Sequence, residues 1–216
     1  MVPVSEARTE ILRRIRSAIG ESPVAPAVPR DYRPDAGYGV EELREVLTDR
    51  LVDYKAQVVP CGATREEITA AVAGVVSGHG LTSLVAPPRV AQEWLAELAS
   101  GQDVQVVADE AAVTTQDLDG VDAVVTGAAL AIAETGVIVL DGDEWCGRRA
   151  ISLVPDVHVC VVRLDQVVGL PPEAIVRLDP RRPQTWIAGP SATSDIELDR
   201  VEGVHGPRTL VVVLAG

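Results

Sequence analysis

The sequence predicts an α/β domain whose sheet is largely parallel and covered on both faces, preceded by a helical extension. Two observations indicate this fold class. Short β-branched runs recur from residue 56 onward, and alanine-rich helical stretches separate several of them. Hydrophobic residues make up 47% of the 216-residue chain, which is enough to build a full core.

The extension comprises residues 1–54. Residues 5–19 predict an amphipathic helix that Ser5 can cap and Gly20 can end, with apolar residues at helical spacing. Pro23, Pro26, Pro29 and Pro34 then predict an extended connector, and a second helix follows at about 40–54. We therefore place the domain boundary between residues 54 and 55.

The domain of residues 55–216 contains three expected helices and eight expected strands. The helices are at 64–77, 90–99 and 171–177, and the strands are at 56–60, 82–87, 103–107, 122–127, 137–141, 157–163, 184–189 and 209–214. Between 121 and 163 the strands follow one another with only loops between them, which predicts an antiparallel or meandering portion.

Composition excludes several classes of function. The net charge of −13 argues against a nucleic-acid partner, and Lys55 is the only lysine for a phosphate loop or a Schiff base. Cys61, Cys146 and Cys160 are widely separated, so we expect no metal site or iron–sulfur cluster in this chain. The chain also has no nucleotide-binding G-x-G-x-x-G motif and no flavin cradle, so we expect no other cofactor. The first residues lack the apolar core of a signal peptide, and no apolar run reaches the roughly 18 residues of a membrane helix. We expect a soluble, cytoplasmic protein without a membrane span.

A first candidate site lies in residues 122–142. Ligands of open α/β sheets bind beyond the carboxyl ends of strands, and Thr126 and Gly127 end a predicted strand. Glu134, Thr135 and Gly136 form a polar turn within an apolar stretch. Glu134 is either a catalytic base or nucleophile, or a turn residue satisfied by backbone N–H groups; the sequence leaves both readings open.

A second candidate site lies in residues 184–210, where a strand leads into a loop of small residues and a predicted helix start. Its candidate ligand-binding residues are Gly189, Pro190, Ser191, Thr193, Ser194 and His205. Free N–H groups and hydroxyls at such a start bind anions, although the same residues can be a plain helix cap and His205 a surface histidine. Arg148 and Arg149 could clamp a carboxylate or phosphate, or pair with nearby acids.

Three stretches together resemble the LUD-domain family of the lactate-utilisation protein C type. They are TGAALAIAETGVIVLD (126–141), GRRAISLVPDVHVCVVRLDQVV (147–168) and GPSATSDIELDRVEGVHGPRTLVVVL (189–214). The resemblance implies a Rossmann-like open sheet of the NagB/RpiA/CoA-transferase-like type. It also implies a role beside two iron–sulfur lactate-utilisation proteins in oxidising L-lactate to pyruvate.

The residues narrow what the resemblance implies. Since this chain holds no cluster ligands, we expect the clusters in the partner subunits and a small-anion-binding or assembly role here. The alternative is a stand-alone enzyme of the sugar-phosphate isomerase or CoA-transferase-like fold that uses Glu134.

Overall fold

The computed structural model describes residues 4–20, 27–29, 32–101, 103–193, 201–202 and 206–216. The chain divides into two compact units, Met1–Tyr32 and Arg33–Gly216. The smaller unit contains helix α1 (Val4–Ile19), which confirms the helix expected at 5–19, and Gly20 ends it in a left-handed conformation. Ser5 lies inside the first turn of α1, so the helix begins one residue earlier than expected. In the described part of the chain, no helix is both long and apolar enough to cross a membrane.

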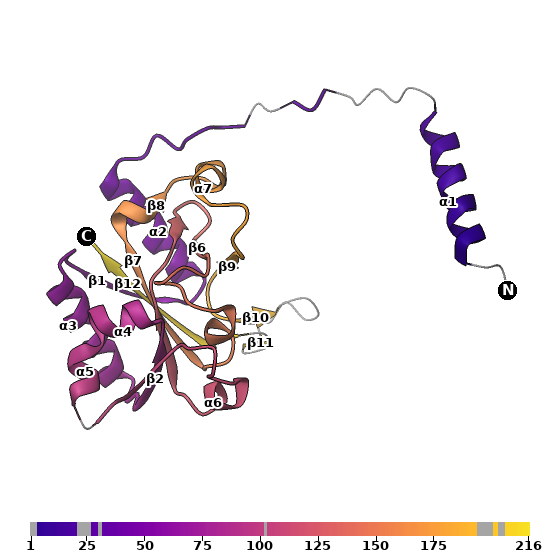
Figure 1. Ribbon diagram of the computed structural model, residues 1–216. Coiled ribbons are helices and arrows are strands. Elements are labelled where there is room, and N and C mark those ends of the chain that lie inside the picture. Colours follow the sequence, from indigo (N-terminus) through magenta and orange to yellow (C-terminus); the bar gives the residue numbers. More distant parts are fainter. Residues whose placement is uncertain (1–3, 21–26, 30–31, 102, 194–200, 203–205) are drawn as a thin grey trace. The chain divides into compact units, whose positions relative to one another are not determined.

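The larger unit is built on a six-stranded sheet in which every neighbouring pair of strands is parallel (Figure 1). Its order is β1 (Gln57–Cys61), β12 (Thr209–Ala215), β7 (Val157–Arg163), β4 (Ala123–Thr126), β2 (Ser83–Ala86) and β3 (Gln105–Ala108). Strands β7 and β12 are almost entirely buried, which explains their continuous apolar sequences. The predicted α/β fold with a largely parallel sheet is confirmed.

Both faces of this sheet are covered. Helices α3 (Arg65–Gly78), α4 (Pro88–Trp94) and α5 (Ala96–Ser100) lie on one face, where Val159 and Val161 of β7 pack against Ile68 of α3. Helix α2 (Val40–Asp53) contributes Leu47 to the other face, against Cys160 of β7. Helix α6 (Thr115–Asp119) contributes Leu118 to a smaller cluster. Successive residues of each strand thus enter two different cores.

A second sheet of four strands packs against the face that carries α2. Its order is β8 (Val167–Val168), β5 (Leu130–Ile132), β6 (Val137–Leu140) and β9 (Thr185–Ile187). The pair β5–β6 is antiparallel, as expected within 121–163, whereas β4 and β7 on either side are parallel neighbours. Strand β6 also pairs antiparallel with β9, which lies outside that range. Helix α7 (Pro171–Arg177) packs on this sheet through Ala174. Two strands, β10 (Ala192–Thr193) and β11 (Val201–Glu202), form a separate antiparallel pair.

The larger unit begins earlier than the expected boundary at residues 54 and 55. Leu47 and Leu51 of α2 are fully buried in its core, so α2 belongs with the sheet and not with α1. Residues 33–38 form a strap along the same unit, where the backbone N–H of Ala36 donates to Glu173 Oε1 at 3.1 Å. Contacts of this kind place the division after Tyr32.

Candidate functional site

The two adjacent arginines of the 147–149 loop have different surroundings. Arg148 donates from its backbone N–H to Asp109 Oδ2 at 2.9 Å and from Nε to Oδ1 at 2.6 Å. The Asp109 side chain is only 2% exposed, so Arg148 neutralises a buried carboxylate. Arg149 is exposed, and no carboxylate in the described part of the chain pairs with it. From the sequence, both arginines were candidates for binding an anion. In the described structure the Arg148 guanidinium is paired with Asp109, so of the two only the Arg149 guanidinium is available for a ligand.

Arg149 lies on a cavity of about 310 Å³ that we call the amino-end pocket, because its floor includes residues near the amino ends of β7 and β12. The segment from β9 to Ser191 forms one wall, and Leu153, His158, Gly206, Pro207 and Leu210 complete much of the lining. Gly189 has φ +78°, and a Cβ there would approach Tyr54 Cβ to 2.6 Å, so glycine is required at this turn. Arg149, Gly189, Pro190 and Ser191, chosen from separate parts of the sequence, therefore meet on one cavity.

This position corrects one expectation. The sequence predicts the strand at 184–189 as part of the parallel sheet, which would place the loop after it at the carboxyl ends of the parallel strands. Strand β9 instead belongs to the second sheet, and its end lies by the opposite edge of the main sheet. Thr193 lies in β10, whereas Ser194 and His205 fall outside the described residues, so the helix start expected at Ser194 stays a prediction.

His158 forms the buried part of the amino-end pocket. It is 1% exposed, and its Nε2 lies 2.8 Å from Thr126 Oγ1. The Thr126 hydroxyl is 3.6 Å from Cys160 Sγ, and the Cys160 thiol donates to the Gly127 carbonyl at 3.6 Å. Burial lowers the pKa of His158 to about 4 and raises that of Cys160 to about 12, so both are neutral near pH 7. Thr126, expected at a ligand, thus supports a buried histidine.

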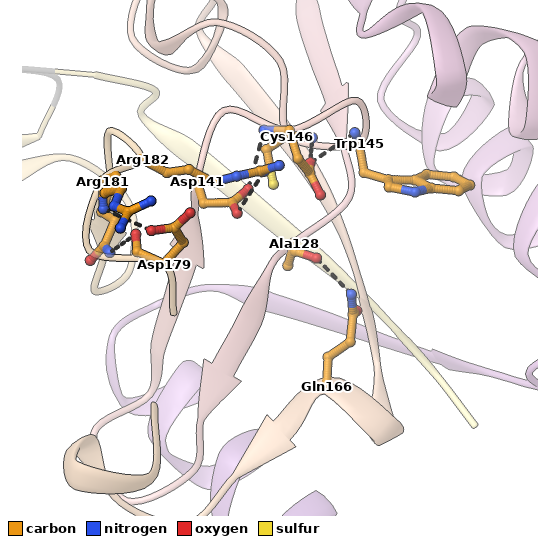
Figure 2. Close-up of polar contacts among 10 residues, drawn as sticks. Ala128, Asp141, Trp145, Cys146, Gln166, Asp179, Arg181 and Arg182 are labelled. Atoms are coloured by element: carbon orange, nitrogen blue, oxygen red, sulfur yellow. Dashed lines mark hydrogen bonds and ion pairs between the residues drawn. The ribbon is translucent and has the colours of Figure 1, made fainter. Parts of the chain in front are cut away.

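A second cavity of about 350 Å³, the carboxyl-end crevice, lies where open α/β sheets usually bind ligands. Gly127 and Ala128 line it, together with Trp94, Trp145 and Arg163. The Gly127 N–H donates to the Trp145 carbonyl at 2.9 Å, and a Cβ on Gly127 would approach Trp145 Cβ to 3.0 Å. Figure 2 shows Gln166 donating to the Ala128 carbonyl, at 2.6 Å. Gly127 was predicted from the sequence as a ligand-binding residue. No sequence pattern indicated Trp94 and Trp145, because they come from distant segments of the chain.

Glu134 lines neither cavity. Its carboxylate pairs with Arg33 of the strap and accepts a hydrogen bond from the Tyr38 hydroxyl at 3.1 Å. That carboxylate raises the pKa of Tyr38, chiefly through the hydrogen bond. In the same turn, Thr135 Oγ1 is buried without a hydrogen-bond partner among the described residues, and Gly136 has φ +61° against Arg50. The contacts of Glu134 with Arg33 and Tyr38 fasten the strap to the turn between β5 and β6, whereas Gly136 lies against α2.

Asp141, Asp143 and Cys146 have ligand atoms within 4.8 Å of one another, a spacing that a metal ion could use. Figure 2 shows Asp141 paired with Arg182, and the two groups are 3.0 Å apart. Asp143 Oδ1 accepts a hydrogen bond from the Cys146 N–H at 2.8 Å. Burial raises the pKa of the Cys146 thiol far above its usual value, which opposes the thiolate that a metal needs. The expectation of no metal in this chain stays a prediction.

Comparison with known proteins gives consistent relatives. The LUD domain family model matches residues 39–215. The chain is 40% identical to lactate utilization protein C of Deinococcus radiodurans, covering 98% of this chain and 97% of that protein, and 27% identical to the protein of the same name in Bacillus subtilis, covering 94% and 93%. A crystal structure of a DUF162 family protein from Deinococcus radiodurans matches with a TM-score of 0.67 and 33% identity. That match covers 83% of this chain and 99% of the other.

Proposed function

Because the chain belongs to the LUD-domain family, we propose that it takes part in lactate utilisation as a subunit that does not itself carry electrons. In this proposal it binds a small anionic ligand in the amino-end pocket. Iron–sulfur proteins act with it in the oxidation of L-lactate to pyruvate.

The observation that carries the proposal is the gathering of Arg149, Gly189, Pro190 and Ser191 on one cavity. A guanidinium without a carboxylate partner in the described part of the chain suits the carboxylate of lactate or pyruvate. The apolar part of such a ligand would meet Leu153 and Leu210. This combination of one charged group and an apolar lining is typical of small-molecule sites.

Lactate oxidation removes two electrons, which require an acceptor such as a flavin, a nicotinamide or a cluster. The chain has three cysteines, fewer than the four thiolates that a cluster normally takes. Cys146 and Cys160 are buried, and their thiol pKa values are raised. These properties support placing the electron carriers in partner proteins. All three cysteines are free, as is usual in a reducing compartment, which supports a cytoplasmic location.

The alternative, a stand-alone enzyme with Glu134 as base or nucleophile, has weaker support. Glu134 Oε1 is in contact with both Arg33 and Tyr38, and Glu134 lines neither cavity. A carboxylate engaged in this way is suited to fastening the strap.

Growth on L-lactate as the sole carbon source tests the proposal. A host that lacks its own copy of this protein would receive the wild-type chain, Arg149→Gln or Glu134→Gln, with Arg177→Gln, at an exposed position of α7, as the matched control. We expect wild type, Glu134→Gln and the control to restore growth and Arg149→Gln to fail at equal protein level. Growth with Arg149→Gln and none with Glu134→Gln would favour the alternative.

A further inference from the structure

We propose that His158 makes the amino-end pocket selective for a hydroxycarboxylate over the corresponding oxo acid. In this inference, His158 Nδ1 accepts a hydrogen bond from the hydroxyl of the ligand while Arg149 binds its carboxylate. The inference rests on the proposed function for the identity of the site and adds the group that determines specificity.

The hydrogen bonds behind His158 determine which ring nitrogen carries the proton. The Gly127 carbonyl can only accept, so the Cys160 thiol uses its hydrogen there. Cys160 Sγ can then accept a hydrogen bond from the Thr126 hydroxyl, and that bond uses the only hydrogen of the hydroxyl. Thr126 Oγ1, 2.8 Å from His158 Nε2, is left as an acceptor, and Nε2 must therefore be the donor.

The opposite tautomer makes fewer hydrogen bonds in the same place. If the Thr126 hydroxyl donated to Nε2, the contact from Thr126 to Cys160 would be lost and Nδ1 would carry a hydrogen. The arrangement with Nε2–H keeps both contacts, and a buried polar group favours the state in which more of its bonds are made. A neutral His158 carries one proton on its ring, so Nδ1 has a free lone pair.

The inference places that lone pair on the side of the ring that faces the pocket. His158 lines the cavity, and no described residue hydrogen-bonds to its second ring nitrogen. A hydroxyl on the ligand can donate to Nδ1, whereas a ketone oxygen has only lone pairs to offer. One net hydrogen bond corresponds to about a fivefold to tenfold difference in affinity, and leaving Nδ1 without a donor adds to it. We therefore expect L-lactate to bind about tenfold more tightly than pyruvate or propionate.

Trp186 supplies the readout, because it lies on the wall of the pocket and is 42% exposed. The test is a fluorescence titration of the full-length chain with L-lactate, pyruvate and propionate, with Trp186→Phe to show that the signal comes from this site. Thr126→Val removes the acceptor that holds Nε2–H, and Thr126→Ser retains it. We expect Thr126→Val to lose the preference for lactate while still binding propionate, and Thr126→Ser to keep the preference.

The tautomer can be observed directly, because the chain has three histidines, His79, His158 and His205. In a ¹⁵N-histidine spectrum we expect the buried residue, identified with His158→Gln, to show a protonated Nε2 and an unprotonated Nδ1. Equal affinity for the three acids, tighter binding of pyruvate, or a protonated Nδ1 would overturn the inference while leaving the anion site intact. The absence of saturation with all three acids would overturn the anion site as well.

Discussion

Arg148 and Arg149 are neighbours in sequence, and replacing each by glutamine should have opposite consequences. Arg148→Gln removes the guanidinium from a carboxylate that is 2% exposed, although the backbone N–H of residue 148 still donates to it. Breaking a buried ion pair costs about 3–5 kcal/mol. Because the Arg148 side chain is itself 40% exposed, we discount this to about 2–3 kcal/mol.

Urea unfolding followed by circular dichroism measures this loss, and the melting temperature should fall by about 4–12 °C for a unit of this size. Arg149→Gln should stay within about 0.5 kcal/mol of wild type, because it breaks no ion pair in the described structure. Adding Asp109→Asn to Arg148→Gln should recover part of the loss by removing the uncompensated charge. Equal stability of the two arginine variants would refute the assignment of Arg148 to the fold and Arg149 to the ligand.

Two further predictions concern stability. Burial holds the pKa of His158 at about 4, below its ordinary 6.5, so the unfolded chain binds a proton first as the pH falls. The contribution of neutral His158 to the free energy of unfolding is therefore fully present above pH 6.5, and it is lost as the pH falls towards 4. Between these values wild type should lose about 3 kcal/mol more than His158→Gln in urea unfolding, and parallel losses would contradict the burial argument. Deleting residues 1–32 should leave the melting temperature of the larger unit within about 2 °C. Deleting residues 1–39 should lower it clearly, because the contacts of the strap with Glu134 and Glu173 are lost. Equal melting of the two truncated chains would show that the strap does not stabilise this unit.

Much of the fold could be predicted because its elements have strong local patterns. Strand β7 and helix α7 match the expected ranges, since one is a valine-rich run and the other starts with two prolines after a loop. Strands β5 and β8 contain three and two residues, too few for any periodicity to show. Their pairing is decided by the packing of the second sheet on the first. Helix α2 was recognised, but its place in the core depends on burial contacts that sequence spacing does not reveal.

The candidate site could be predicted in part. The small-residue loop at 189–191 carries its own signal, and the structure places it on a cavity with Arg149. The sequence could not separate Arg148 from Arg149, because the difference lies in Asp109, some 39 residues away. The sequence also gave no indication that Glu134 pairs with Arg33, or that the rings of Trp94 and Trp145 lie against each other at the crevice. Such contacts between distant segments form only when the sheet brings them together.

The most direct test of the central claim is lactate-dependent reduction of an artificial dye by purified components. We predict no activity from this chain alone. With the proposed iron–sulfur partners added, the wild-type chain should be required, and Arg149→Gln should lower the rate by about tenfold or more, the effect of losing one charge-assisted contact, with assembly intact. Dye reduction by the wild-type chain alone, or an unchanged rate with Arg149→Gln in the complete mixture, would contradict the account.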